Sequence, residues 1–331
     1  MAAKRVAVFD NLKAILIFFV VLGHITTQFK PANEVLSAIT FFIYTFHMPA
    51  FIFVSGIFCK HSVNKKEFPR AKFITFIVLY LICMSLVFLS KLYFNDMNNA
   101  QFNIFSCSSV PWYMLAMAIW YTITWIIKDF NPKYVFVTAI IISCFAGYMR
   151  GDSDFLCILR VITFYPFFYA GYILDPEKIN VFTSKKSLRI ISAVLMVGLF
   201  VFVMLDYKNI PWIWDVLTGR CAYKDYRHCF ASAWAIRLAY YALVPVFVFA
   251  LTCIAPRRKM FFTNVGSSTL QIYILHMPIV YLMRGFGLFD LIIQSKLYVL
   301  YFVILAIVIT EFLSLNIFGK IIGPLMKPLK K

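Results

Sequence analysis

The sequence predicts an all-α polytopic membrane protein, with about ten transmembrane helices in a single domain over residues 1–331. Hydrophobic residues make up 62% of the chain and charged residues only 14%, whereas soluble domains carry roughly 25% charged residues. Apolar runs of about 17–25 residues, the length that crosses a bilayer as a helix, recur along the chain. Lysine and arginine gather in alternate short loops between these runs, as the positive-inside rule requires.

Ten apolar segments are predicted to be helices. Their ranges are 12–29, 36–59, 73–90, 112–128, 134–148, 155–174, 189–205, 233–255, 268–282 and 297–317. Lys4 and Arg5 precede the first segment, and every second loop after it is rich in cations, most clearly the loop 60–72. These loops are therefore expected on the cytoplasmic side, together with both termini.

Composition also excludes several classes of protein. The formal net charge of +18 lies in short loops, and no nucleic-acid-binding motif accompanies it, so a nucleic-acid-binding protein is not expected. No cleavage site of a signal peptide follows the first apolar run, so the multi-pass chain is expected in the cell membrane. The eight cysteines show no metal-ligand spacing, and no metal is predicted. A Cys221–Cys229 disulfide in an outer loop is left open.

The first two segments carry the ionisable residues that point most clearly to chemistry. Ionisable groups at membrane depth are costly, rare and usually functional. His24 lies past the bilayer middle, and His47 lies about twelve residues before the cytoplasmic end of the second segment. Antiparallel neighbours with these offsets would place both histidines at similar depth. Either can take and return a proton near neutral pH; the alternative is that each is a packing residue bonded to a helix carbonyl.

Other polar features have a structural and a functional interpretation. Arg160 either snorkels to the outer interface or faces a substrate, and His276 is either structural or part of the site. Glu311 either pairs with a cation or serves transport. The cations of the loop 60–72 reflect ordinary topology, or they form a phosphate-binding mouth. The aromatic and charged outer loop 206–232 is either an interfacial belt or a lid that binds sugar.

Five short motifs follow one another along the chain. They are Asp10-Asn11-Leu12-Lys13 with Gly23-His24, Phe46-His47-Met48-Pro49, Pro111-Trp112-Tyr113, Arg160 with Pro166-Phe167-Phe168, and Ile272-Tyr273-Ile274-Leu275-His276. In this order they resemble the membrane acyltransferase 3 family over nearly the whole chain. Lys13 stands where many members carry arginine, and lysine is the commoner choice in the fucose 4-O-acetylase-like branch. Tyr113 stands where the family often has phenylalanine.

The resemblance implies transfer of an acyl group, usually acetyl, from cytoplasmic acyl-CoA to a hydroxyl of a cell-envelope glycan or glycolipid. His24 is expected to act as general base or to form a transient acyl-imidazole. His47 and Arg160 are expected to stabilise the oxyanion or to position the acceptor, and Asp10 is expected to orient Lys13. The predicted catalytic residues are His24, His47, Asp10 and Lys13.

The remaining expected site residues bind substrates. Acetyl-CoA is the expected donor, with its phosphates near Lys13, Arg70 and Lys72. A second group is expected on the acceptor side, and its members are Arg160, Trp112, Tyr113 and His276. Two rival classes stay open: a proton-coupled transporter or flippase in which the histidines relay protons, and a sensor or scaffold whose polar residues are structural.

Overall fold

The computed structural model describes residues 7–30, 32–93, 102–106, 110–149, 154–220, 222–223 and 230–326. Within these residues, the only β-type pairing is an isolated antiparallel bridge between Ser106 and Phe155. The rest of the regular structure is helical, so the predicted all-α class is confirmed. Lys4, Arg5, Cys221 and Cys229 lie outside the described residues, as do both chain ends.

Each of the ten predicted ranges holds a helix. These helices are α1 (Ala7–Thr26), α2 (Glu34–Val63), α3 (Arg70–Tyr93), α4 (Trp112–Ile126), α5 (Pro132–Ala146), α6 (Ile158–Ile173), α8 (Lys186–Asp206), α10 (Ala233–Ile254), α12 (Thr269–Gly285) and α14 (Tyr298–Ser314). Five shorter helices join them: α7 (Pro176–Thr183), α9 (Trp214–Thr218), α11 (Thr263–Ser267), α13 (Leu288–Ile293) and α15 (Asn316–Met326). A 3-10 turn, η1 (Thr27–Phe29), continues α1.

Five of the helices have the length and hydropathy to cross a membrane, namely α1 with η1, α2, α3, α8 and α10. A sixth span results if α14 and α15, which meet at a bend of 57°, are counted together. Helices α4, α5 and α6 are apolar but have only 15 or 16 residues. At 1.5 Å per residue they are about 23 Å long, less than the roughly 30 Å of a bilayer core.

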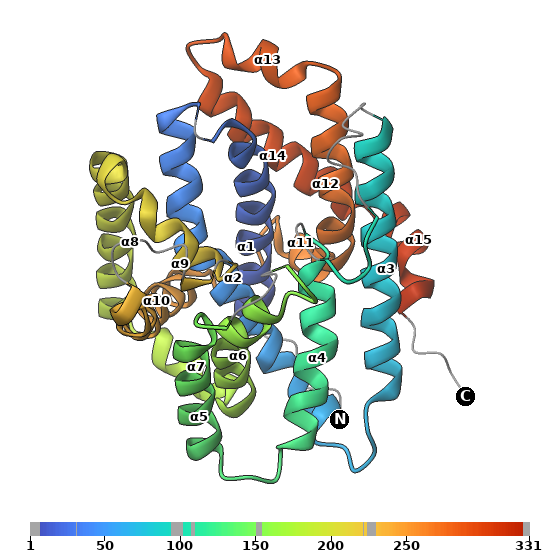
Figure 1. Ribbon diagram of the computed structural model, residues 1–331. Helices are drawn as coiled ribbons and strands as arrows, with labels where there is room; N and C mark the ends of the chain where they lie inside the picture. The colour runs from blue at the N-terminus through green and yellow to red at the C-terminus, as the bar shows by residue number, and fades with distance from the viewer. Residues whose placement is uncertain are drawn as a thin grey trace.

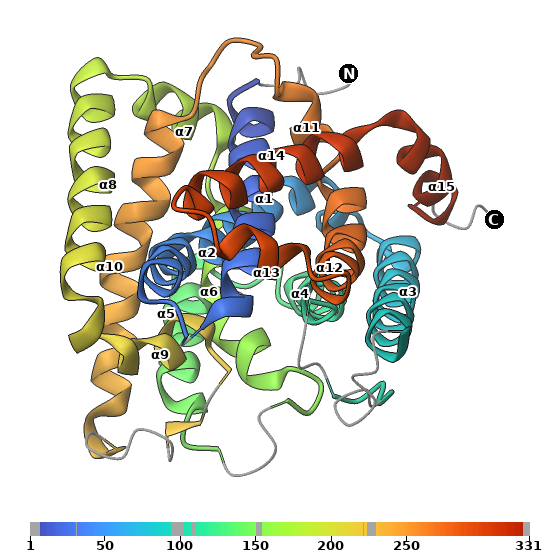
Figure 2. The same cartoon turned by 90° about the horizontal axis from the view of Figure 1, so that it is seen from above.

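Helix α1 lies at the centre of the molecule and α8 at its edge (Figures 1 and 2). In the apolar window of α1, 72% of the residues are buried, against 11% in α8 and 22% in α3. Helix α1 packs against α2, α11, α12 and α14. Figure 2 shows α8 beside α10 on one flank and α3 on the opposite flank. The ionisable residues of α1 therefore lie inside the protein.

Two tight contacts hold α1 and α2 in place. Gly266 of α11 lies against the backbone of Asp10, and Asn11 donates hydrogen bonds to the carbonyl oxygens of Pro256 and Arg258, at 2.7 and 2.8 Å. Helices α2 and α6 cross where Gly56 meets the carbonyl of Phe168, and Gly171 meets that of Phe53. Only a residue without Cβ permits backbones to approach so closely.

Candidate active site

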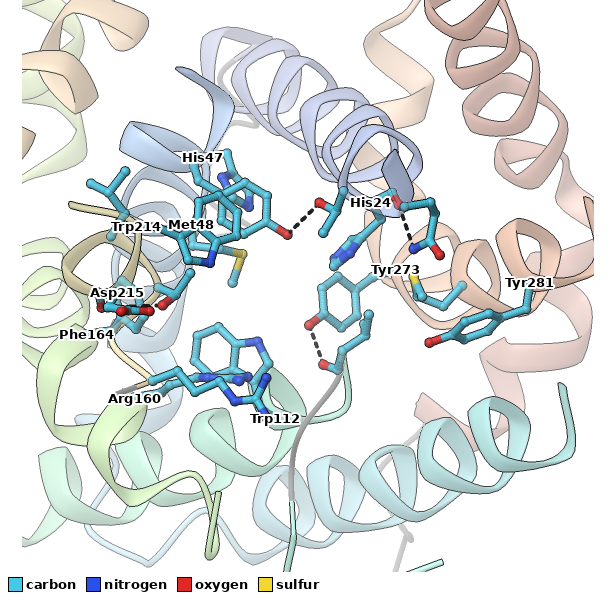
Figure 3. A pocket seen from close by; sticks show the side chains of 18 residues that line it. His24, His47, Met48, Trp112, Arg160, Phe164, Trp214, Asp215, Tyr273 and Tyr281 are labelled. Atoms are coloured by element: carbon cyan, nitrogen blue, oxygen red, sulfur yellow. Dashed lines mark hydrogen bonds between the residues drawn. The ribbon is translucent and has the colours of Figure 1, made fainter. Parts of the chain in front are cut away.

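A cavity of about 420 Å³ opens between α1, α2, α6, α9 and α12 (Figure 3). It brings together residues that the sequence singled out from four separate segments: His24, His47, Trp112 and Arg160. In the view of Figure 3, the two histidines lie on one side of the cavity, with Arg160 and Trp112 on the other. Its volume is within the range of about 300–1,000 Å³ that is usual for small-ligand sites.

His24 lies in the last turn of α1 and is half-buried because its side chain faces the cavity. Within the described residues, no hydrogen bond to either ring nitrogen of His24 is present. Its backbone carbonyl accepts a hydrogen bond from Gln28 Nε2 at 3.2 Å. The ring of His276 packs behind it, with 5.2 Å between ring centroids. His24 thus presents an imidazole to the cavity with a second imidazole at its back.

His47 is buried in α2, and its tautomer follows from its neighbour. Its Nδ1 lies 2.8 Å from the carbonyl oxygen of Ile43, one helical turn earlier. A carbonyl oxygen carries no hydrogen, so Nδ1 must donate, and in the neutral ring Nε2 keeps its lone pair. Tyr44 lies on the same face of α2, with its ring centroid 4.6 Å from that of His47. His47 therefore offers an acceptor nitrogen in a fixed orientation.

Arg160 is buried rather than extended to an interface, which excludes the snorkelling interpretation. Its guanidinium lies 5.3 Å from the ring centroid of Trp112 and 4.0 Å from Asp154. The same carboxylate accepts two hydrogen bonds from Arg220, whose Nε lies 2.8 Å away. Two arginines thus share one carboxylate at the wall of the cavity.

Helix α9 forms the rim of the cavity with Trp214 and Asp215. Trp214 packs on Tyr44, with 4.5 Å between centroids, and the Lys30 ammonium lies 3.3 Å from the Trp214 ring centroid. Burial lowers the pKa of the Lys30 ammonium from 10.5 to about 8, and the Asp215 carboxylate opposes part of this shift. The described part of the loop 206–232 thus contributes to the lining of the cavity, as the lid interpretation expects.

A second cavity of about 150 Å³ contains Lys13. The Lys13 ammonium pairs with Asp10 at 2.9 Å and lies 4.9 Å from the Phe58 ring centroid. Tyr113 lines this cavity, and its hydroxyl hydrogen bonds with that of Ser55 at 2.6 Å. The sequence placed Tyr113 with the acceptor-binding residues, whereas the structure places it beside Lys13.

Tyr273 of α12 lines both cavities. Its hydroxyl donates to the carbonyl oxygen of Val110 at 2.6 Å, and its ring packs against that of Tyr113, with 5.2 Å between centroids. Val110 also lines the larger cavity. Tyr273 is therefore a residue that both the Lys13 cavity and the His24 cavity contact.

Comparison with known proteins identifies the family. A family model described as an acyltransferase domain matches residues 6–312. The chain belongs to the acyltransferase 3 family. Neither the comparison with curated proteins nor that with solved structures found a match. Membership supports membrane acyltransferase activity.

Besides Asp10, Lys13 and Tyr113, three more of the expected site residues do not line the larger cavity. His276 is fully buried behind His24 and does not line it. Arg70 and Lys72 are exposed at the start of α3 and line neither that cavity nor the one around Lys13. No cluster of potential metal ligands occurs in the part of the chain that the structure describes.

Sequence reasoning missed Tyr44, Asp154 and Arg220. A signal for Tyr44 was available, because it lies three positions before His47 and hence on the same helical face. The ion pair of Asp154 with Arg220 joins positions 66 apart, in segments that no periodic pattern connects. Such a pair becomes visible only when the helices are assembled.

Proposed function

We propose that this acyltransferase 3 protein transfers an acetyl group from cytoplasmic acetyl-CoA to a hydroxyl of a cell-envelope or exopolysaccharide glycan. The observation that carries the proposal is the shared wall of Tyr273, between a cavity with a lysine and a cavity with two histidines. A donor entering past Lys13 and an acceptor held beside His24 would meet at this wall. The membrane then separates the two substrates until their reacting groups are in contact.

The Lys13 cavity suits the narrow end of the donor. At about 150 Å³ it is too small for a whole nucleotide. Lys13 already pairs with Asp10, so one of its three N–H donors is used and the others can hold the carbonyl groups of a pantetheine arm. About 16 Å of helix separates Lys13 from His24. The phosphates of the donor would then lie outside this cavity, where the exposed cations Arg70 and Lys72 can bind them.

The His24 cavity suits a sugar. Its walls include the aromatic faces of Tyr44, Trp112, Phe164 and Trp214, with a few charged groups among them. Ligand sites of this kind use aromatic surface for contact and a small number of polar groups for orientation. The cation cluster of Arg160 and Arg220 adds donors for sugar oxygens.

The proposed reaction uses one proton and one leaving group. A His24 ring nitrogen takes the proton of the acceptor hydroxyl, and the oxygen attacks the thioester carbonyl carbon. The carbon–sulfur bond breaks, and the thiolate of CoA takes the proton from the His24 imidazolium. The products are an acetyl ester and CoA, so His24 returns to its neutral form.

The tautomer of His47 separates its role from that of Arg160. With its Nδ1–H held by Ile43, neutral His47 accepts a hydrogen bond at Nε2 and is suited to orient the acceptor hydroxyl. Arg160 only donates, and it is suited to stabilise the negative oxygen of the tetrahedral intermediate. His47 is also the alternative base, because its lone pair is fixed.

Acetyl transfer by the purified protein in detergent tests the proposal. The assay measures CoA release from acetyl-CoA and label transfer to an envelope glycan extract from the source cells. His24→Ala should lower the rate by about 10²–10⁴-fold, as expected for loss of a general base. His61→Ala, which changes an exposed histidine at the end of α2, is the matched control.

Two results would contradict the proposal. A His24→Ala rate within about threefold of wild type, below the usual contribution of a general base, would remove His24 as the base. No transfer by the wild type would favour transport, although Glu311, which a proton relay was expected to use, does not line the His24 cavity.

A further inference from the structure

His276 holds a buried nitrogen that the proposed function does not use. The side chain is fully buried in α12, and its Nδ1 lies 3.1 Å from the carbonyl oxygen of Ile272. As with His47, Nδ1 must donate, so the neutral ring keeps a lone pair on Nε2. No hydrogen-bond partner of Nε2 is present among the described residues. A buried acceptor without a donor destabilises the folded state and needs an explanation.

Two aromatic rings lie against His276, and only one has a donor to give. Tyr273 packs at 5.8 Å between centroids, but its hydroxyl hydrogen goes to Val110. His24 packs at 5.2 Å between centroids, and within the described residues its ring nitrogens have no hydrogen-bond partner. The two rings are tilted by 38° and no hydrogen bond joins them in the structure. At this centroid spacing, a rotation that turns the ring edges toward each other leaves about 3 Å between nitrogens, the length of a hydrogen bond.

We propose that His276 is the positioning residue of His24: its Nε2 accepts the N–H of the His24 ring and fixes which His24 nitrogen carries the lone pair. This inference rests on the proposed function, because it concerns the same base. The proton stays on His24, and no bond is made or broken at His276. The other His24 nitrogen is thereby held as the base that faces the cavity.

The same interaction acts when His24 becomes charged. The imidazolium carries hydrogen on both nitrogens, and one of them remains bonded to His276 while the other returns its proton to the thiolate. Charged and polar groups on other elements that line the same cavity include His47 and Tyr44 of α2, Arg160 of α6, Asp215 of α9 and Arg220. In the proposed function His47 Nε2 is taken up by the acceptor hydroxyl. The two arginines only donate, and the Tyr44 hydroxyl already accepts from Thr27 Oγ1 at 3.5 Å. Asp215 lies on the rim with Lys30.

Two substitutions of His276 separate positioning from packing. His276→Gln keeps an acceptor near the place of Nε2, and His276→Leu removes it while filling a similar space. Tyr240→Phe is the matched control, because the buried Tyr240 hydroxyl likewise has no hydrogen-bond partner in the described part, and Tyr240 does not line the cavity. Each variant is assayed with acetyl-CoA as the varied substrate, and its Tm is recorded.

His276→Leu should lower kcat at least tenfold, part of the about 10²–10⁴-fold that a general base contributes, with the KM for acetyl-CoA within about threefold of wild type. His276→Gln should recover most of this loss, and Tyr240→Phe should match wild type. Equal rates for the Gln and Leu variants, or a loss carried by KM, would overturn the proposal. Loss of activity in His24→Ala with none in His276→Leu would refute this inference and leave the proposed function standing.

Nitrogen NMR of the wild-type protein with isotope-labelled histidine gives a test that needs no measurement of activity. The His24 signals, assigned by their absence from His24→Ala, should show one neutral tautomer with a single protonated nitrogen. A mixture of the two tautomers would overturn the proposal, because an acceptor at fixed distance selects one of them.

Discussion

At the residue scale, the chemistry of the site depends on which ring nitrogens carry hydrogen. His47 and His276 occur in two His-Met-Pro segments, and both bond through Nδ1 to the carbonyl of the residue four positions earlier. His24 has no such carbonyl partner within the described residues, so the orientation of its ring depends on its surroundings. Sequence predicted that His24 and His47 share a depth because helix rise is constant. The sequence pattern does not predict that His276 packs behind His24, because α12 meets α1 only in the assembled fold.

Binding of the acceptor should depend on pH through the protonation of Lys30 at the rim of the cavity. Above pH of about 8, Lys30 loses its proton, and the neutral amine no longer binds the Trp214 face as a cation. Transfer should therefore show a rising KM for the glycan extract above this pH. Lys30→Arg keeps its charge and should abolish the rise; a rise of equal size in both proteins would contradict this assignment.

The folding stability of the protein should increase over the same pH range in which binding of the acceptor weakens. The pKa of Lys30 is lowered in the folded state, so the unfolded chain binds this proton more tightly. Folding stability therefore increases as the pH rises from about 8 toward 10.5, and the cost of the buried charge is fully present below this window. Unfolding of wild type and Lys30→Arg across these pH values measures the difference, and parallel curves would contradict it.

At the element scale, the position of His47 relative to Arg160 depends on the crossing of α2 and α6. Ser55-Gly56 is a small-residue pair, and such pairs permit close helix approach. The sequence does not show that Gly171 makes the reciprocal contact, because this requires knowing that the two helices are neighbours. Arg160 follows two non-glycine residues with positive φ, Leu156 and Cys157 at 48° and 53°, and this turn directs the start of α6.

Gly171→Ala tests the crossing. A Cβ at this position meets the carbonyl oxygen of Phe53, so the helices must separate, at a cost of about 1–3 kcal/mol of unfolding free energy. Gly198→Ala in α8 is the control, because nothing lies within 4 Å of its Cβ, and it should gain about 0.5–1 kcal/mol. Comparison of Tm values decides; equal effects of the two substitutions would contradict the tight crossing.

At the scale of the whole molecule, the proposed function depends on two cavities that both reach Tyr273. The ten predicted ranges were all found as helices because long apolar runs have few other stable forms in a membrane. The short helices α9 and α11 were not predicted, because five residues carry no periodic pattern. These two short helices supply the cavity rim and the contact that fixes Asp10.

The role of Tyr273 can be tested by measuring CoA release that is not coupled to acetyl transfer. Tyr273→Ala should join the cavities and admit water to the thioester, so CoA release without any glycan should rise several-fold. Tyr273→Phe keeps the ring and loses only the hydrogen bond to Val110, and it should release much less CoA than the Ala variant. Equal release by wild type and Tyr273→Ala would show that the side chain does not separate the substrates.

Calorimetry of acetyl-CoA binding tests the central claim most directly, namely that the donor enters at Lys13 and reacts at His24. Wild type should bind acetyl-CoA without any gradient or acceptor. Lys13→Met should weaken binding, whereas His24→Ala and the exposed control Lys296→Met should keep it. Absence of binding by the folded wild type, or equal loss in the Lys13 and His24 variants, would contradict the account.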